Sequence, residues 1–577
     1  MDIYTLSEKI TQNHPLLKKY SPLVAQLLLN RSITETTAAE EFIKPSYTGN
    51  HDPLLLHNCE QAIDQIYSAI IHTKKIIIYA DYDADGIPGA VVLSTLFDKI
   101  GYTNYDIYIP HRHDEGYGLH IEALEKCKND GAELIITIDL GVTAIDQADW
   151  CNDNNIELIV TDHHLPQTDP AGNEELPHAL VVNPKQSACH YPEPMLCGAG
   201  VIFKIVQAFI QKYGEEFNVH VGWEKWLLDM VGLATISDMV PLTGENRIFA
   251  YFGMEVMKKT RRGGLKKMMW DAGINNRYMT TSDIGFNLTP RINAASRMSH
   301  PKDALAVLRA SKTNEIERSA NLLTELNNTR KKLTRSTTKK AIAMVNEKNI
   351  PKVIAVGNKD WSIGIAGLVA SKLVDRFKRP VFVWTEEHGV IKGSARSYGD
   401  VHLIELMKAC PSSTFESFGG HKEAAGFTCT KKYIDDLETY LSEALNSLPQ
   451  EKSTQRHGII VDAEIGKDQI IFETYKDLRK LAPFGIGNEE PIFIIKDVQL
   501  EHVGTFGKEG DHTEVVFSNT KNEPIRGICF FKQPNEFTIT PKTGDTVSLV
   551  GTIEFSTFMG KNELRIKVID ITEIDKI

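Results

Sequence analysis

Five short apolar runs between residues 76 and 182 constrain the fold of this chain more than any other feature. They are rich in β-branched residues, helical patterns separate them, and they lie at 76–80, 106–110, 133–138, 156–161 and 179–182. Strands that alternate with helices are typical of a parallel, doubly wound α/β sheet. We therefore expect such a sheet at the centre of residues 71–300.

The remainder of the chain divides where this pattern changes. No Gly or Pro occurs in the 49 residues between Pro301 and Pro351, so most of this window is predicted to be helix, and a helix of that length usually bridges two bodies. A smaller α/β pattern follows, and after a polar linker at 447–457 the chain carries short strands with turn signals, for which an OB-like β-barrel is one option. We predict a helical segment, the α/β domain, the bridge, a second α/β domain and a barrel, at 1–70, 71–300, 301–350, 351–450 and 451–577.

Composition narrows the class of protein. The 577 residues carry 64 Lys and Arg against 76 Asp and Glu, a net charge of −12, so bulk positive charge cannot attract a polyanionic partner. No apolar run approaches the ~18–20 residues of a membrane span, and residues 1–20 lack the apolar core of a signal peptide, so we expect a cytoplasmic protein with no membrane association. The eight cysteines contain no C-x-x-C pair and are expected to be reduced thiols.

Acids and histidines follow three of the predicted strands, at the point where each strand ends. In an open α/β sheet, ligands bind outside the carboxyl ends of the strands. Here those positions hold five acids and two histidines, namely Asp81, Asp83, Asp85, Asp139, Asp162, His163 and His164. We expect them to gather at one edge of one sheet.

Metal binding explains this arrangement better than the alternatives do. Carboxylates this close together raise one another's pKa values unless cations sit among them, and carboxylates with one or two imidazoles suit Mn²⁺ or Mg²⁺. A single acid after a strand is more often the N-cap of the next helix, but three such positions in one sheet favour a two-metal site. The segment 81–86 also resembles the start of an EF-hand loop, yet Val92 stands where that loop needs Glu.

These motifs resemble the DHH phosphoesterase family, which is named for the motif present here as Asp162-His163-His164. The segment Asp81–Gly86 narrows the resemblance to the RecJ branch of single-strand-specific exonucleases. Further segments similar to that branch, including its accessory DHHA1 and OB-like parts, are 290–295, 393–397, 419–426 and 483–488. Departures at Ala80, Leu140 and Ser296 remove no expected ligand.

The resemblance assigns roles to individual residues. It implies metal ligation by Asp81, Asp83, Asp85, Asp139, His163 and Asp238, with Asp139 between the two ions. Asp162 is expected to orient a neighbouring imidazole, and His164 to face the scissile phosphate. Asp238 stands at the end of a helical pattern and would by itself be an ordinary turn acid.

The implied reaction is hydrolysis of single-stranded DNA from the 5′ end to mononucleotides, in recombination and DNA repair. Two divalent ions, Mn²⁺ or Mg²⁺, would activate the attacking water and stabilise the leaving oxygen. Polarity requires a pocket for the 5′-phosphate, and by resemblance the candidate substrate-binding residues are Arg112, Arg291, Ser394, Arg396, Gly419, Gly420 and His421.

Simpler interpretations of the substrate-binding residues stay open at this stage. Arg112 could pair with Asp114 or Glu115 at the surface, and Gly419-Gly420 could be only a tight turn. The basic run at 330–340 could be a solvated helix face, although it would also serve as an electrostatic track for single-stranded DNA.

Two other functions compete with the exonuclease. One is a DHH/DHHA1 phosphodiesterase acting on short oligonucleotides or cyclic dinucleotides, but such enzymes are generally shorter and lack the barrel. The other is an inactive replication scaffold, whose known forms have lost ligands that are present here. From the family we also expect a single-strand-binding protein and a RecQ-type helicase as partners. Nothing in the sequence suggests an obligate multimer, so we expect a monomer.

Overall fold

The computed structural model describes residues 4–169, 171–449, 458–507, 510–557 and 562–573. The predicted polar linker falls largely on residues 450–457 and to that extent lies outside the described residues. None of the helices in the described ranges is both long and apolar enough to cross a membrane.

A five-stranded parallel sheet forms the centre of the first α/β domain. Its strands are, in spatial order, β3 (Tyr105–Tyr108), β2 (Ile76–Ala80), β4 (Leu134–Ile138), β5 (Glu157–Thr161) and β8 (Leu180–Val182). All five predicted strands are therefore present, and every pairing between neighbours is parallel. The predicted doubly wound α/β fold is confirmed.

Helices cover both faces of this sheet because alternate strand residues point to opposite faces. Ile76 and Ile78 share a core with α4 and α7, whereas Ile77 and Tyr79 share one with α5 and α6. The bounds are α4 (Gly86–Ile100), α5 (Ile121–Asn129), α6 (Ile145–Asp153) and α7 (Gly198–Tyr213). A small hairpin, β6 (Gln167–Thr168) with β7 (Glu174–Glu175), projects from the domain.

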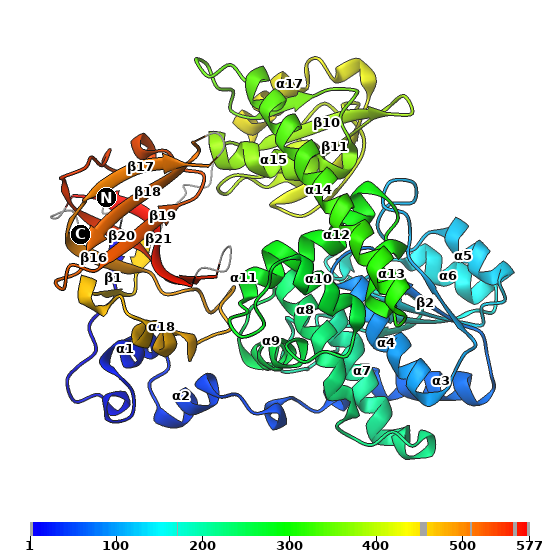
Figure 1. The fold of residues 1–577 in the computed structure, drawn as a ribbon. Helices are drawn as coiled ribbons and strands as arrows, with labels where there is room; N and C mark the ends of the chain where they lie inside the picture. Colours follow the sequence, from blue (N-terminus) through cyan, green and yellow to red (C-terminus); the bar gives the residue numbers. More distant parts are fainter. Residues whose placement is uncertain (1–3, 170, 450–457, 508–509, 558–561, 574–577) are drawn as a thin grey trace.

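A layer of helices follows the sheet and leads to the second domain. Its members are η4 (Gly214–Phe217), η5 (Trp223–Leu227), α8 (Leu228–Ser237), α9 (Gly244–Met257), α10 (Gly263–Asp271), α11 (Thr281–Asp283), the π-helix η6 (Ile284–Leu288), α12 (Thr289–Met298), α13 (Lys302–Arg309) and α14 (Thr313–Met344). The predicted bridge thus consists of two helices, broken at 310–312, and α14 extends from the first domain to the second (Figure 1).

The second domain is a mixed sheet with helices against it. Its five strands have the spatial order β12, β13, β11, β10, β9, and only β9 and β10 pair in parallel. The elements are β9 (Ile354–Gly357), α15 (Ile363–Phe377), β10 (Val381–Glu387), β11 (Val390–Arg396), α16 (Leu403–Lys408), β12 (Phe415–Gly420), β13 (Ala424–Cys429), η7 (Lys431–Tyr433) and α17 (Leu437–Ser447).

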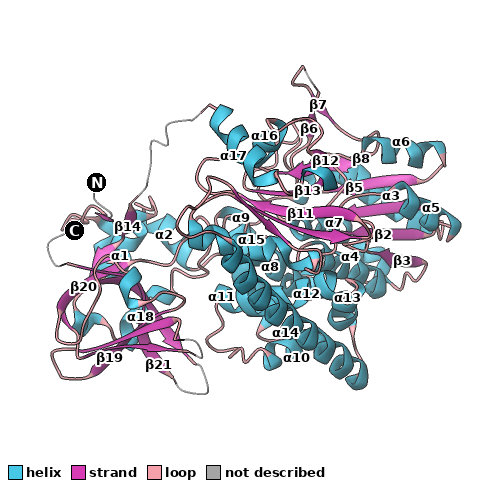
Figure 2. Ribbon diagram, turned by 90° about the horizontal axis from the view of Figure 1, so that it is seen from above, coloured by secondary structure: helices cyan, strands magenta, loops and turns pink. Residues whose placement is uncertain are grey.

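The C-terminal domain is a seven-stranded sheet in the order β15, β16, β20, β21, β19, β18, β17. Its elements are β14 (Ile459–Val461), β15 (Ala463–Glu464), η8 (Lys467–Gln469), α18 (Phe472–Arg479), β16 (Phe493–Gln499), β17 (His502–Phe506), β18 (His512–Ser518), β19 (Pro524–Cys529), η9 (Pro534–Glu536), β20 (Thr546–Ser556) and β21 (Glu563–Thr572). Figures 1 and 2 both show this sheet beside the first domain.

The N-terminal segment packs against two domains: residues 16–39 contribute to the core of the C-terminal domain, and residues 56–70 to that of the first domain. Its elements are β1 (Tyr4–Leu6), η1 (Pro15–Lys18), α1 (Pro22–Asn30), α2 (Thr36–Ile43), η2 (Tyr47–Gly49), η3 (Pro53–Leu55) and α3 (Cys59–Ile71). β1 pairs in parallel with β14, and Leu27 and Leu28 of α1 share a core with Phe493 and Leu549. The two ends of the chain therefore meet, which no local pattern in the sequence indicates.

Candidate active site

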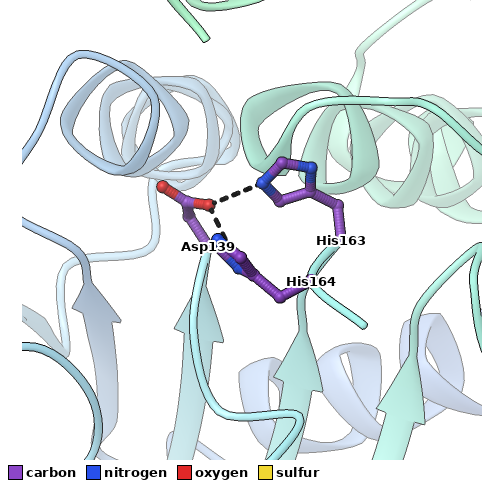
Figure 3. Close-up of side chains that lie close together, drawn as sticks. All are labelled: Asp139, His163 and His164. Carbon is purple, nitrogen blue, oxygen red and sulfur yellow. Dashed lines mark ion pairs between the residues drawn. The ribbon is translucent and has the colours of Figure 1, made fainter. Parts of the chain in front are cut away.

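The acids and histidines gather at the carboxyl edge of the parallel sheet, as expected. Asp139 follows β4, and the adjacent strand β5 leads into His163 and His164 (Figure 3). His163 Nε2 lies 3.1 Å from Asp139 Oδ1, and His164 Nδ1 lies 3.9 Å from the same oxygen. These contacts join two neighbouring strand ends into one site.

Asp238 reaches the same site from the C-terminal end of α8. Its Oδ2 lies 3.8 Å from His163 Nε2, and Asp85 Oδ2 lies at the same distance from that nitrogen. Met239, the next residue, has a φ of 60°, a left-handed conformation that is uncommon for a side chain of this kind. The backbone is therefore held in an unfavourable turn beside a predicted ligand.

Close backbone packing fixes the other acids. Both oxygens of Asp85 accept hydrogen bonds from the first N–H groups of α7, at 2.6 Å from Gly198 and 2.7 Å from Ala199. A Cβ on Gly198 would lie 2.6 Å from that of Asp139, so only glycine fits there. Asp139 itself has a φ of 65°, and its position is thus determined by tertiary packing.

Among the described residues, three groups of side chains are close enough to hold a metal ion. Within each group the ligand atoms all lie within 4.8 Å of one another. The groups are Asp81 with Asp83 and Asp139, Asp85 with His163 and Asp238, and Asp139 with His163 and His164. All six predicted metal ligands are included, and Asp139 belongs to two of the groups.

The raised pKa values of these acids indicate that bound cations would stabilise their ionised forms. Burial, together with the neighbouring Asp83, raises the pKa of Asp85 to about 7, and burial with Asp85 raises that of Asp238 to about 9. Burial also raises the pKa values of Asp81 and Asp139 well above the usual range, and nearby carboxylates add to this. We call Asp81, Asp83, Asp85, Asp139 and Asp238 the acidic wall.

Unpartnered buried atoms test whether a metal fits. Oδ1 of Asp81, Oδ1 of Asp139 and both ring nitrogens of His163 are buried without a hydrogen-bond partner. Burial and the neighbouring His164 lower the pKa of His163 to about 3, so its imidazole is neutral and can coordinate a metal. Carboxylate oxygens with one neutral imidazole suit Mn²⁺ or Mg²⁺, and the donor set therefore fits.

Asp162 and His164 form a hydrogen-bonded pair beside the ligands. His164 Nδ1 lies 2.8 Å from Asp162 Oδ1, and Asp162 also accepts from the N–H groups of Val142, His163 and His164. Burial opposes ionisation of Asp162, but these bonds outweigh it and lower the pKa. Burial likewise opposes protonation of His164, yet the bond with Asp162 leaves its pKa raised. The geometry matches the predicted orienting contact.

A cavity of about 260 Å³ opens in front of the acidic wall. Its lining consists of Asp81, Tyr82, Asp83, Arg112, Tyr117, Asp139, His164, Asp238, Asn293 and Arg297. Arg112 lies with its guanidinium carbon 4.8 Å from the centre of the Tyr82 ring. It does not form the surface pair with Asp114 or Glu115: Asp114 pairs with His111, and Glu115 lies 3.7 Å from Lys126.

Arginines from both domains face this cavity or lie close behind it. Burial lowers the pKa of Arg297 to about 9, with contributions from Arg112, Arg330 and Arg396, and Arg112 also lowers that of Arg396. We call Arg112, Arg297, Arg330 and Arg396 the basic wall. Within the described part of the chain, no salt bridge joins any of the four to a carboxylate. Four clustered guanidinium groups that form no salt bridge among the described residues can bind an anion.

Ser394, Gly419, Gly420 and His421 lie on the second sheet or directly beside it. Ser394 of β11 pairs with Gly426, which in turn pairs with Gly419, so the three form a row across β11, β13 and β12. A Cβ on Gly419 would meet nothing within 4 Å, and His421 is exposed beside Gly420. This row of small residues leaves the backbone open to a ligand that passes Arg396.

Arg291 is not brought into the cavity. It is buried on α12, where its guanidinium donates to the carbonyl oxygens of Asn287 and Asp271. Arg297, Arg330 and Asn293 take the positions near the cavity instead. Arg330 belongs to the basic run at 330–340, whereas Asn293 and Arg297 lie on α12, where an isolated polar residue on a helix is ordinary.

Comparisons with known proteins agree with this geometry. Family models match residues 75–235 as the DHH family N-terminal domain, 349–448 as the DHHA1 domain and 461–570 as the RecJ OB domain. The single-stranded-DNA-specific exonuclease RecJ of Bacillus subtilis is 34% identical over 95% of this chain and 68% of its own length. The chain belongs to the RecJ family.

Other members and solved structures support the assignment. RecJ of Haemophilus influenzae is 31% identical over 83% of each chain. The crystal structure of RecJ from Thermus thermophilus in complex with Mn²⁺ has a TM-score of 0.80 at 22% identity, over 99% of this chain and 79% of that one, and it shows the shared fold. A structure of exonuclease RecJ bound to manganese has a TM-score of 0.60 at 27% identity, over 68% of this chain and 96% of that one.

Proposed function

We propose that this RecJ family member removes nucleotides from the 5′ end of single-stranded DNA, in recombination and DNA repair. As a member of the family, the chain is a metal-dependent, single-stranded-DNA-specific exonuclease. One observation supports both this active site and the 5′-to-3′ direction. Across one small cavity, the acidic wall, which would bind cations, faces the basic wall, which would bind an anion. A terminal phosphate beside the metal site satisfies both walls.

Divalent Mn²⁺ or Mg²⁺ held by the acidic wall and His163 would supply an acidified water and neutralise charge on the phosphate oxygens. The residues of the chain do the rest. Asp162 accepts the Nδ1 proton of His164, which leaves the other ring nitrogen free to act toward the phosphate. The hydrogen bond with Asp162 outweighs burial and raises the pKa of His164, which favours a protonated ring that would donate its proton to the leaving oxygen.

The basic wall supports the 5′-to-3′ polarity. A guanidinium binds two phosphate oxygens at once, and Arg112 and Arg297 lie directly on the cavity. Arg396 lies close behind them on β11, next to Ser394. A 5′-phosphate held by these groups would place the first phosphodiester bond in front of the acidic wall, so each cut would release a mononucleotide.

We propose that the chain acts as a monomer and that a single-strand-binding protein and a RecQ-type helicase deliver its substrate. The resemblance to the family supports these partners. Stimulation of hydrolysis of a long strand by either purified protein, at fixed exonuclease concentration, would measure the effect.

A single assay tests the proposed activity. The purified chain is incubated with Mn²⁺ or Mg²⁺ and one of four substrates: 5′-labelled or 3′-labelled single-stranded DNA, duplex DNA, or a cyclic dinucleotide. We expect mononucleotides from the 5′ label at the earliest times, on single strands only. Preferred hydrolysis of the cyclic dinucleotide would instead favour the phosphodiesterase, and early release of the 3′ label would reverse the proposed polarity.

A further inference from the structure

α12, the helix that carries Arg297 to the cavity, has one face whose side chains are not buried. From η6 into α12, the residues that are not buried include Phe286, Pro290, Asn293 and Arg297, at spacings of four, three and four. Such spacing places side chains on one face of a helix. Asn293 and Arg297 line the cavity, and Asn293 Oδ1 is buried without a partner. The face therefore leads from the active site along the helix to Phe286.

Two large aromatic side chains stand at the far end of this face. Phe286 is 77% exposed and Trp270, at the end of α10, is 81% exposed. Arg291 joins their two segments, because its guanidinium donates to the carbonyl oxygens of Asp271 and Asn287, which follow Trp270 and Phe286 in sequence. The buried Arg291 thus fastens the end of α10 to η6 and holds the two aromatics in one neighbourhood.

The conformation of η6 also favours a functional role. It is a π-helix of five residues inserted directly before α12, and such insertions are rare and frequent at functional sites. Phe286 is its central residue, and among the described residues its ring stays largely exposed. An exposed aromatic in an irregular turn gains nothing from burial, so its position needs another explanation.

Positively charged side chains of α14 lie near the helices that carry these two aromatics. α14 packs against both α10 and α12 and carries Arg330 and Lys331. Burial lowers the pKa of Lys331, and Arg291 and Arg330 lower it further, which places the three cations near one another. Aromatic planes beside a basic track are the arrangement that binds single-stranded nucleic acid without sequence preference.

We propose that Trp270 and Phe286 form a stacking platform for bases of the substrate strand behind the nucleotide being removed. The inference rests on the proposed function and adds a subsite to it. Phe286 and Arg297 are eleven residues apart, or about 16 Å along the helix, which corresponds to roughly four or five stacked nucleotides. The platform therefore holds bases near the fourth and fifth nucleotides from the 5′ end, while the walls hold the terminal phosphate.

Substrate length provides the first test. We compare the kcat/KM of the wild type and of the double variant W270A/F286A on 5′-phosphorylated oligonucleotides of 2 and 16 nucleotides. The ratio of the long to the short substrate should fall roughly tenfold or more in the variant, through KM, because stacking on the platform is lost for the long substrate only. An equal loss on both lengths would overturn the platform.

Abasic nucleotides locate the contact. On a 16-nucleotide strand without bases at positions 3–6, the wild type should be about as slow as the double variant is on the intact strand. The double variant itself should be slowed little further by the missing bases. Trp270→Phe, which keeps an aromatic plane, should recover most of the affinity. If the variant stays as sensitive to abasic nucleotides as the wild type, the stacking assignment is refuted.

Binding without hydrolysis separates this inference from the proposed function. With the metal chelated, oligo-dT of 16 nucleotides should quench tryptophan fluorescence of the wild type more than that of Trp270→Phe. Trp226→Phe serves as the control, because this indole is also exposed but lies on η5 beneath the guanidinium of Arg261. Wild-type protein that fails to hydrolyse DNA would refute the function, whereas a quench unchanged in Trp270→Phe would refute only the platform.

Discussion

The two walls of the cavity differ in charge and also in how the chain builds them. Most of the acidic wall comes from the ends of neighbouring parallel strands, so one sheet holds it in place. The basic wall takes Arg112, Arg297, Arg330 and Arg396 from a loop, two helices and a strand of the second domain. Metal binding should therefore depend on the first domain alone, whereas phosphate binding depends on the contact between both.

Asp139→Asn should have the largest effect on turnover. Asparagine keeps the shape and tolerates the left-handed backbone, but it removes the carboxylate shared by two of the metal groups. Since a catalytic metal supplies several kcal/mol, we expect a loss of about a thousandfold or more in single-turnover rate.

The thermal stability of Asp139→Asn distinguishes this loss from unfolding. In the absence of metal its Tm should equal or exceed that of the wild type, because burial and the neighbouring carboxylates both disfavour the ionised carboxyl that is removed. A large fall in Tm would mean that Asp139 serves the fold.

Removal of metal should make the stability of the protein depend on pH. Asp85 and Asp238 have folded-state pKa values near 7 and 9, above their values in the unfolded chain, so the folded protein binds more protons. The contribution of these two protonated carboxyls to the free energy of unfolding is fully present below about pH 4. It is lost as the pH rises towards 7 for Asp85 and then towards 9 for Asp238. Bound cations should cancel the loss.

Thermal melts at pH 5, 7 and 9, with chelator or with Mn²⁺, measure this effect. The gain in Tm from Mn²⁺ should increase with pH. A gain that does not change over this range would contradict the arrangement of the acidic wall.

Arg396→Ala should weaken discrimination at the 5′ end more than it weakens hydrolysis itself. A hydrogen bond to a charged group contributes about 1.5–3 kcal/mol, so the preference for a 5′-phosphate over a 5′-hydroxyl should fall roughly ten- to hundredfold. Arg396→Lys should restore little, because it lacks the planar fork. An unchanged preference would remove Arg396 from the phosphate site.

His113→Ala should give the smallest effect. His113 Nε2 bonds the carbonyl oxygen of Arg297, and it packs near Gly364, whose own carbonyl accepts from Arg297 Nη1. The bond joins the loop of Arg112 to the domain contact, and its loss costs about 1 kcal/mol. We expect KM for a 5′-phosphorylated strand to rise roughly fivefold, with partial rescue in His113→Asn. A change in kcat alone would contradict a positioning role.

The strand-end acids show how much of the site the sequence predicts. Each follows an uninterrupted apolar strand, and parallel strands end at the same edge of the sheet. Asp81, Asp139 and His163 therefore lie close together independently of the loop conformations. Asp238 required the resemblance to the family. It caps a helix and reaches His163 only because α8 packs across that edge.

The sequence by itself determined the parallel sheet and the residue types at its edge, because strand periodicity and local order are sufficient for both. Only the tertiary structure decided which arginines face the cavity. Arg291 and Arg297 lie on one helix six residues apart, yet packing buries the first against backbone carbonyls and turns the second toward the site. Their environments come from segments distant in the chain, and no local pattern records such contacts.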